Sequence, residues 1–442
     1  MGTAVAAVAL VLAGCANAKN GASGGGTGAP GVSSNLIQVG SIANVTGPLS
    51  SDFAPVVNGV QAYFSMINAE GGVAGRKLQL AYQTDDQGSS TTDLTDAQKL
   101  VEQDHVFAVV GVGTPFFGGA GYLAEQGVPT FGYAVSTDWQ NRPTLYADYG
   151  SELCFPCGAP GDAYLAQELG ANSIAVVSYS VPQSAAACQA AVNGMKNNFG
   201  ENVSFTDLSF PFGSDPTADV LQMKAHNVDL LFTCLDVTGN VAFAKAMSQN
   251  GLSINQVWFN GYDPSTVQQY GSIMNGVYFG LQHVPFQAAL AYPGLYPGLD
   301  LYIREMQKYQ KAYTYNETAL DGWMAADQFV TGLKLVGRNL TQKKLVTALN
   351  NTTGFTGGLT TPVPWTQDHF HSPPPYCQAS VVVEGGAYHV AFAHNGEVFT
   401  CFGSETSDTP VAPPAGTPGL SSSSGSGNSG TSGNSGSSSS TG

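Results

Sequence analysis

The stretch Ile37-Gln-Val-Gly-Ser-Ile42 opens the regular part of this chain and indicates its class of fold. It is short and rich in apolar β-branched side chains, which is typical of a buried strand. Residues 53–70 follow with apolar side chains at helical spacing (Val57, Val60, Phe64 and Ile67), and Gly71-Gly72 ends that helix. Residues 77–82 then have the pattern of a second strand. A strand, a helix and a strand in this order indicate a parallel βαβ unit.

The same alternation continues and then restarts. Further strands are expected at residues 106–111, 128–133, 174–178, 204–209, 230–234 and 257–260, with helices at 92–102, 122–126, 184–199, 218–226 and 240–250. Later helices are expected at 301–310, 318–336 and 343–349, and a hairpin at 379–393 around Gly385-Gly386. We therefore predict an α/β fold with two doubly wound parallel-sheet lobes joined by a hinge.

The composition excludes several classes of protein. The 442 residues carry 15 Lys and Arg against 31 Asp and Glu, a net charge of −16. Nucleic-acid binding needs grouped basic side chains, and no such group is present. Anionic membrane surfaces are disfavoured for the same reason. No apolar run reaches the roughly 18 residues of a spanning helix, which excludes a polytopic membrane protein.

Both ends of the chain differ from its middle. Residues 4–13 are apolar and suit the hydrophobic region of a signal peptide. Leu12-Ala-Gly-Cys15 resembles the lipobox of bacterial lipoproteins, which implies a signal peptide at 1–14, a lipid on Cys15 and a position on the outer face of the cell membrane. The alternative is a Cys buried in an N-terminal helix. We expect residues 15–34 to be a lipidated flexible tether and residues 405–442 to be a disordered Ser/Gly-rich tail.

The remaining cysteines support export. Six Cys besides Cys15 form an even set, as disulfides require, and disulfides persist outside the cytoplasm. Cys234 ends a strand, and Cys188 lies in the helix that follows a neighbouring strand, so we predict that these two pair. Cys377 begins the late hairpin, and Cys401 lies a few residues beyond its return and can curl back within reach, so we predict that these two pair as well. This leaves Cys154 and Cys157 for each other.

A resemblance to a known family becomes specific in the first half. The runs Ile37-Gln-Val-Gly40, Thr46-Gly-Pro-Leu49 and Ile67-Asn-Ala-Glu-Gly-Gly-Val-Ala-Gly-Arg-Lys77 resemble the leucine/isoleucine/valine-binding family, which are type 1 periplasmic solute-binding proteins of ABC importers. The resemblance implies a ligand between two lobes, an amino acid or a similar small carboxylate or amide, and the membrane subunits of an ABC importer as partners. The expected lobes are residues 35–155 with 287–350, and 156–286 with 375–404.

The resemblance also points to candidate ligand-binding residues. Thr114 falls in the loop whose hydroxyl residue binds the ligand carboxylate in the family, and Ala134 and Ser136 fall in a second carboxylate-binding turn. Asp263 falls where an acidic residue pairs with the ligand ammonium. Tyr179 is a candidate aromatic wall from the second lobe, and Phe53 is a candidate cover from the first.

Each candidate also has a plainer interpretation. Thr114 and Asp263 could be N-caps of the helices that follow. Tyr179 could be a half-buried core residue. Residues 131–137 could be an ordinary exit from a strand into a loop.

Catalytic signals are weak. The only G-x-S-x-G run, Gly21–Gly25, lies in the expected tether and lacks the strand and helix of a nucleophile elbow. His369 and His371 lie in a Pro-rich loop, and Cys154-Phe-Pro-Cys157 has redox spacing without a clear helix. We therefore expect no catalysis, no metal and no cofactor. The alternative function is an exported sensor or receptor-like module of the same fold.

Overall fold

The first lobe is built on a parallel sheet whose strands follow the predicted alternation. The computed structural model describes residues 28–47, 49–149, 160–365 and 376–420. In spatial order the strands are β2 (Lys77–Asp85), β1 (Leu36–Ala43), β3 (Val109–Gly113), β4 (Thr130–Tyr133) and β5 (Leu145–Ala147), all parallel. The segments between them form α1 (Ser50–Phe53), α2 (Val56–Ala69), α3 (Ser90–Glu102), α4 (Ala120–Glu125) and the 3₁₀ turn η1 (Thr137–Trp139).

The second lobe has a larger, mixed sheet. Its parallel part runs β10 (Val277–Leu281), β9 (Asn255–Trp258), β8 (Leu230–Cys234), β6 (Ile174–Tyr179) and β7 (Val203–Phe210). The antiparallel part is β11 (Tyr376–Glu384), β12 (Ala387–Ala391), β13 (Phe399–Phe402) and β14 (Pro410–Val411). The helices are α5 (Pro160–Glu168), α6 (Pro182–Asn193) with a π-helical extension η2 (Gly194–Phe199), α7 (Thr217–Ala225), α8 (Val237–Gln249) and α9 (Pro264–Tyr270).

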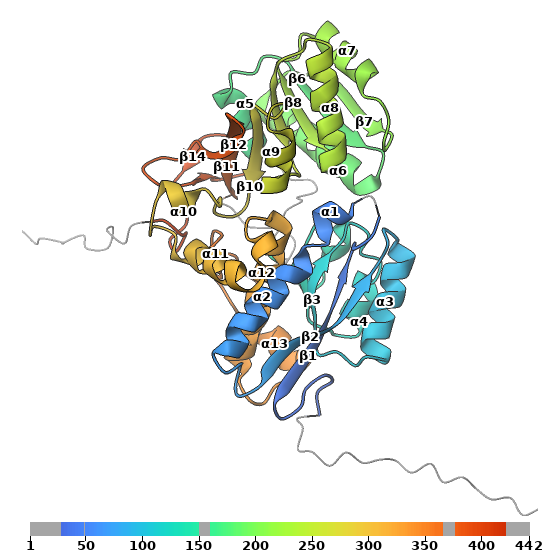
Figure 1. Cartoon of the computed structure of the whole chain (residues 1–442), viewed down its shortest axis with the longest axis vertical. Helices are drawn as coiled ribbons and strands as arrows, with labels where there is room; N and C mark the ends of the chain where they lie inside the picture. The colour runs from blue at the N-terminus through green and yellow to red at the C-terminus, as the bar shows by residue number, and fades with distance from the viewer. Residues whose placement is uncertain (1–27, 48, 150–159, 366–375, 421–442) are drawn as a thin grey trace, which may run out of the picture.

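After the second lobe the chain returns to the first. The returning elements are α10 (Ala288–Ala291), α11 (Pro297–Tyr309), η3 (Lys311–Tyr313), α12 (Glu317–Val336) and α13 (Gln342–Leu349). Figure 1 shows the two sheets stacked end to end, with α11, α12 and α13 beside the first lobe. The prediction of two α/β lobes is confirmed. None of the helices in the described residues is long and apolar enough to pass through a bilayer.

Helix α12 is held against α2 by an unusually close approach of two backbones. A Cβ atom on Gly59 of α2 would overlap the carbonyl oxygen of Ala319, and one on Gly322 of α12 would overlap that of Val56. Glycine alone allows this contact. The Tyr63 hydroxyl also donates to Asp327 Oδ1 at 2.5 Å. These contacts join the beginning of the chain to the part that returns from the second lobe.

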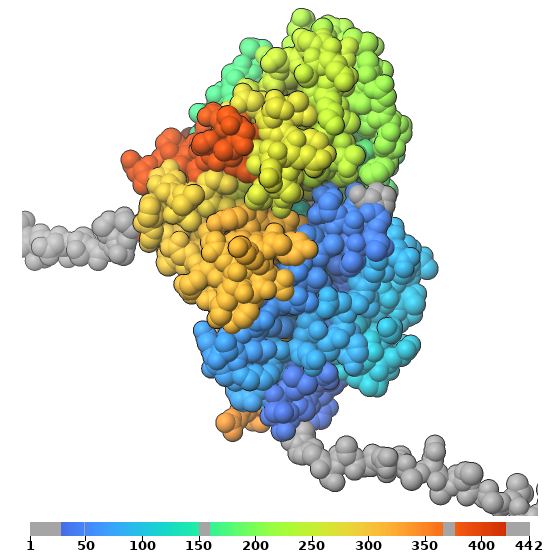
Figure 2. Space-filling view, viewed as in Figure 1, coloured from blue at the N-terminus to red at the C-terminus, as the bar shows by residue number. Residues whose placement is uncertain are grey.

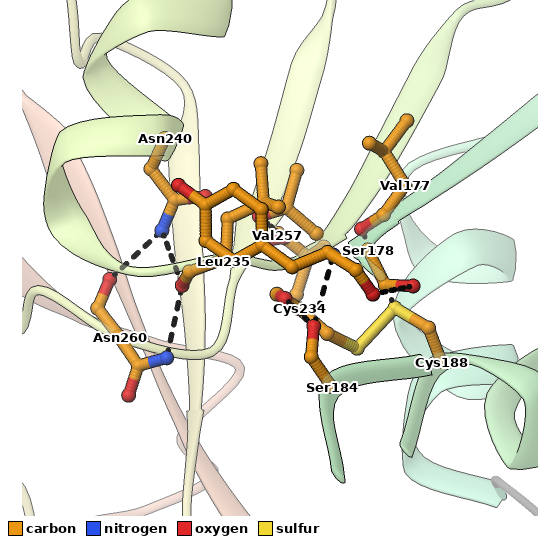
Figure 3. The surroundings of a disulfide bond; sticks show 11 residues. Val177, Ser178, Ser184, Cys188, Cys234, Leu235, Asn240, Val257 and Asn260 are labelled. Atoms are coloured by element: carbon orange, nitrogen blue, oxygen red, sulfur yellow. Dashed lines mark hydrogen bonds between the residues drawn. A yellow bond between two sulfur atoms is a disulfide. The ribbon is translucent and has the colours of Figure 1, made fainter. Parts of the chain in front are cut away.

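Two predicted disulfides are present. Cys188 of α6 is bonded to Cys234 at the end of β8, and Figure 3 shows this bond beside Ser178 and Ser184. Strands β6 and β8 are neighbours, as the prediction required. Cys377 of β11 is bonded to Cys401 of β13, at directly paired positions. Cys154 and Cys157 lie outside the described residues, as do Cys15, His369 and His371.

Several details differ from the sequence prediction. Strands β5 and β10 and helix α5 were not predicted, because three to nine residues give too little periodicity to recognise, and α9 was expected only as the helix that Asp263 could cap. The expected hairpin is confirmed, and Gly385 and Gly386 at its turn have φ of 58° and 78°, as a tight hairpin turn requires.

The ends of the folded part also extend into the ranges expected to be tether and tail. The amide of Gln38 donates to the Gly31 carbonyl at 2.8 Å, so residue 31 lies against β1. Strand β14 pairs with β13 at Phe402↔Pro410 and Cys401↔Val411. Residue 31 pairs with the beginning of β1, and β14 extends the edge of the second sheet at β13. Local composition reveals neither pairing.

The glycine contact between α2 and α12 gives a stability prediction. Gly322→Ala should lower the free energy of unfolding by about 1–3 kcal/mol, since the new methyl group must push two helices apart. Urea unfolding followed by circular dichroism measures this. Gly121→Ala in helix α4 is the matched control. A Cβ atom at Gly121 would lie 3.6 Å from its nearest neighbour, the side chain of Arg142, which is an ordinary contact distance. That variant should be neutral or more stable by about 0.5–1 kcal/mol. Equal effects of the two substitutions would contradict the proposed close contact.

Candidate functional site

A cavity of about 850 Å³ lies between the lobes, at the carboxyl ends of both sets of parallel strands. In the first lobe its wall includes Asn44 after β1, Gly88 after β2, Phe116 after β3 and Val135 after β4. In the second lobe it includes Tyr179 of β6 and the residues that follow β8, β9 and β10, namely Asp236, Asn260 and His283. Ligands of open α/β sheets bind at this edge. The space-filling view shows the two lobes meeting along one boundary, with residues of the first lobe against the second (Figure 2).

Aromatic and aliphatic side chains make up much of the wall. Phe53 and Tyr133 of the first lobe have ring centroids 5.9 Å apart, and Tyr179 and Phe212 of the second lobe lie 4.8 Å apart. Other apolar side chains of the wall are Leu49, Phe116, Val181, Leu235, Phe259, Leu281 and Val363. A wall of this kind suits a ligand with an apolar body.

The charged side chains of the cavity are almost all acidic. Among the described residues, four carboxylates line it: Asp52, Asp162, Asp236 and Glu317. None of the Lys and Arg residues within the described ranges does so. His283 is present, but its Nδ1 lies 3.0 Å from the carbonyl oxygen of Val284 and its Nε2 lies 3.2 Å from Glu317 Oε1. Within the part of the wall that the structure describes, the one basic side chain is therefore already paired.

The carboxyl group of Asp52, at the boundary between the lobes, is strongly perturbed. Burial, together with the nearby charges of Asp236 and Glu317, raises the pKa of Asp52 to about 7. Burial likewise raises the pKa of Asp162 to about 7. Perturbed carboxyl groups gathered in a cleft are typical of functional sites.

Asp236 is held by the structure around it. Its Oδ1 accepts from the Tyr179 hydroxyl at 2.6 Å and, as the N-cap of α8, from the amide of Gly239 at 2.8 Å. The preceding residue, Leu235, has its carbonyl oxygen bound by the side-chain amides of Asn240 and Asn260 at 3.4 and 2.9 Å (Figure 3). The Cys188–Cys234 bond fixes the same loop from the other side. Asp236 is thus presented to the cavity with little freedom to move.

Two of the predicted site residues line the cavity. Phe53 and Tyr179 are both nearly buried, and they face it from opposite lobes. Thr114, Ala134, Ser136 and Asp263 are not among the lining residues.

Those four have other roles in the structure. The Thr114 hydroxyl donates to Asp86 and accepts from the amide of Phe116 at 3.0 Å. The Ser136 hydroxyl donates to Asp138 at 3.0 Å. Ala134 is packed in the apolar core of the first lobe. The hydroxyls expected to meet a ligand carboxylate are therefore engaged with carboxylates of the protein.

Asp263 caps helix α9, which was its plainer interpretation. Its Oδ1 accepts from the amide of Ser265 at 2.7 Å, and its Oδ2 accepts from the side-chain amide of Asn316 at 2.8 Å. The acidic residues that do line the cavity within the described ranges were not recognised from the sequence; they are Asp52, Asp162, Asp236 and Glu317. Asp236 had a usable signal, because it follows a predicted strand directly and precedes a predicted helix at the ligand-binding edge.

Comparisons with known proteins agree with this architecture. Residues 36–386 match the family model of the periplasmic binding proteins. A fatty acid ABC transporter substrate-binding protein from Thermomonospora curvata is similar in structure, with a TM-score of 0.68 at 16% identity over 88% of this chain and 97% of that one. A branched chain amino acid ABC transporter protein from Thermus thermophilus with bound valine has a TM-score of 0.68 at 16% identity, over 84% and 98%.

A third similar structure is an ABC transporter solute binding protein from R. palustris in complex with benzoate. It has a TM-score of 0.63 at 15% identity, over 87% of this chain and 99% of that one. No curated protein matches the chain. Identities this low establish a shared fold and say nothing about the ligand of this chain.

The raised pKa of Asp52 gives a pH-dependent stability prediction. From about pH 4 to about pH 7 the folded chain keeps a proton that the unfolded chain releases, so this group lowers stability as pH rises. Asp52→Asn removes the titration and should gain stability relative to wild type between about pH 4 and pH 8, by at most ~1.4 kcal/mol per pH unit. Urea unfolding at both pH values measures the difference.

The control for this experiment is a carboxyl group whose pKa is shifted the other way. Hydrogen bonds from Thr217 lower the pKa of Asp215, so its contribution to stability is lost only as pH falls below about 4, and Asp215→Asn should differ from wild type by a nearly constant amount between about pH 4 and pH 8. A flat difference for Asp52→Asn would show that its carboxyl group is not perturbed.

Proposed function

Because the chain belongs to the family of periplasmic binding proteins, we propose that it is an extracytoplasmic solute-binding protein that encloses one small molecule between its lobes and delivers it to an ABC importer. Members of the family and the similar solved structures are solute-binding proteins and not enzymes. The observation that carries the proposal is the cavity formed by both lobes at the carboxyl ends of their parallel strands.

The mechanism follows from this position. A ligand in the cavity contacts Phe53 and Asn44 on the first lobe and Tyr179 and Asp236 on the second. Such a ligand binds the closed arrangement of the lobes more tightly than an open one, and it therefore shifts the population toward closure. The importer then distinguishes loaded from empty protein by the relative position of the two lobes.

The ligand proposed from the sequence is an amino acid or a similar small carboxylate or amide. Similar structures hold valine and benzoate, which have apolar bodies. The aromatic wall supports an apolar body here too, and Asp52 and Asp236 support an ammonium group. A cavity of about 850 Å³ is larger than a small amino acid needs and leaves room for a bulkier side chain.

The proposed location is the outer face of the cell membrane, with a lipid on Cys15. In this proposal residues 1–14 are removed on export, and the Gly-rich segment after Cys15 keeps the lobes near the importer while leaving them free to rotate. A single acyl anchor binds reversibly, so the diacylglycerol of a lipoprotein is what makes attachment stable.

Ligand binding is testable by thermal shift against a panel of amino acids, amides, amines and aromatic acids. A solute that binds the folded state alone raises the melting temperature in a concentration-dependent way. Phe53→Ala should weaken binding of that solute by about 10–100-fold, since a buried aromatic contact worth roughly 1.5–3 kcal/mol is lost. Leu290→Ala is the control, because Leu290 is 86% exposed and lies outside the cavity. Unchanged affinity in Phe53→Ala would place the ligand elsewhere.

Anchoring is tested in cells. The wild-type protein should partition into the detergent phase, and Cys15→Ala should move it to the aqueous phase. Cys157→Ala serves as a control for loss of a Cys in itself. If the Cys15→Ala protein stayed with the membrane, the lipid anchor would be wrong, while the binding function would remain open.

A further inference from the structure

The cavity contains buried hydrogen-bond acceptors that have no donor. Among the described lining residues, the buried side-chain atoms without a hydrogen-bond partner are Asn44 Oδ1, Gln183 Oε1 and Asp236 Oδ2. All three are oxygens. Asn44 and Asp236 are 1% and 4% exposed, and they approach the cavity from opposite lobes. A buried acceptor without a donor is costly, so these atoms require N–H or O–H groups from whatever fills the cavity.

The orientation of the Asn44 amide is fixed by its neighbour. Its Nδ2 donates to Asp86 Oδ1 at 2.8 Å, and the same carboxylate accepts from the amide of Gly88 at 2.8 Å and from the Thr114 hydroxyl. Turning the amide would place its oxygen against a carboxylate. The Asn44 oxygen must therefore be the atom left without a donor.

The charged side chains of the cavity also favour a ligand that donates hydrogen bonds and carries a positive charge. Asp52 of α1, Asp236 at the N-cap of α8 and Glu317 of α12 interact electrostatically around the boundary between the lobes. The groups that interact with the Asp52 carboxylate are these two acids, the Tyr179 hydroxyl and the Ser51 hydroxyl, and His283 is paired with Glu317. Of the described Lys and Arg residues none lines the cavity, so a ligand carboxylate buried here would lack a counter-ion among them, which is unfavourable. An ammonium group would be attracted to all three acids.

The aromatic rings of the cavity wall also suit a cation with an apolar body. Phe53, Tyr133, Tyr179 and Phe212 form two aromatic pairs, one on each lobe. The face of an aromatic ring attracts cations, and its apolar surface accepts a hydrocarbon body. The wall therefore favours a molecule that is apolar over most of its length and cationic at one end.

Resting on the function proposed above, we propose that the solute is a protonated organic amine with an aromatic or branched apolar body and no carboxylate. Its N–H groups pair with Asp236 Oδ2 and Asn44 Oδ1, and its charge is balanced by Asp236 and Asp52. This ligand class differs from the carboxylate-bearing solutes that the sequence indicated, because the hydroxyls expected to hold a carboxylate are bound to Asp86 and Asp138.

The test uses three probes that share a phenyl body and differ in charge. Phenethylamine is a cation, phenylalanine is a zwitterion and 3-phenylpropionate is an anion. Isothermal titration calorimetry of the full chain should give the tightest binding for phenethylamine, weaker binding for phenylalanine and none for the anion. Phenethylamine should bind more weakly at pH 6 than at pH 8, because protonation of Asp52 removes part of the attraction.

Two variants identify the group responsible. Asp236→Asn should weaken phenethylamine binding by roughly tenfold or more, and Asn retains the capacity to cap helix α8, which preserves the fold. The readout is a loss of phenethylamine affinity together with a gain in 3-phenylpropionate affinity, because a purely structural effect would not let the anion bind. Asp52→Asn should shift the two affinities in the same directions and abolish the pH effect, and it serves if Asp236→Asn does not fold. Asp215→Asn, an exposed carboxylate outside the cavity, is the control.

The outcomes separate this inference from the proposed function. Tighter binding of 3-phenylpropionate or phenylalanine than of phenethylamine overturns the amine proposal and leaves the binding function intact. Failure of all three probes in a protein that responds to another member of the solute panel overturns it as well. A protein that responds to no solute at all would instead contradict the proposed function.

Discussion

The close contact between α2 and α12 is the constraint on which the rest of the structure depends. Helix α2 belongs to the first βαβ unit, while α12 is reached only after the chain has built most of the second lobe. Gly59 and Gly322 let the two backbones approach without side chains between them. Side-chain amide groups of Gln328 add bonds to the carbonyl oxygens of Ala147 and Asp148, both at 2.8 Å. The first lobe is therefore completed by a segment more than 250 residues away from its start.

The first turn of α12 connects this helix packing to the cavity. The Thr318 hydroxyl donates to the backbone oxygen of Asp52 at 2.6 Å, which ties the short helix α1 to α12. The adjacent residue, Glu317, faces His283 at the point where the chain leaves the second lobe. Helix α12 thus fixes the position of Asp52 and of Glu317 together. The packing of α2 against α12, outside the cavity, therefore positions Asp52 and Glu317 at the acidic end of the cavity.

The acidic cavity is a cost to the empty protein. Asp52, Asp236 and Glu317 repel one another, and two oxygens from opposite lobes lack donors. Natural sequences keep such unfavourable arrangements where a ligand resolves them. The disulfide at Cys188 and Cys234, with the bonds from Asn240 and Asn260 to Leu235, holds the loop of Asp236 in place against this repulsion.

The sequence by itself determined the alternation of strands and helices, the two lobes, the sheet edges that face each other and the Cys188–Cys234 pair. These features depend on local periodicity and on the regular geometry of parallel sheets, which neighbouring residues encode. It also indicated Phe53 and Tyr179, which line the cavity. Resemblance to a family was less informative for Thr114, Ser136 and Asp263, because a hydroxyl or carboxylate of suitable type can bind the protein as readily as a ligand.

Only the tertiary structure decided which polar groups remain available to a ligand. Whether Thr114 or Asn44 has a free atom depends on Asp86, which approaches from another strand. Whether Asp236 or Asp263 is the acid in the cavity depends on Asn316 and on the packing of α12, both far away in the chain. Hydrogen bonds over such separations are set by the meeting of distant segments, and no local pattern in the sequence records them.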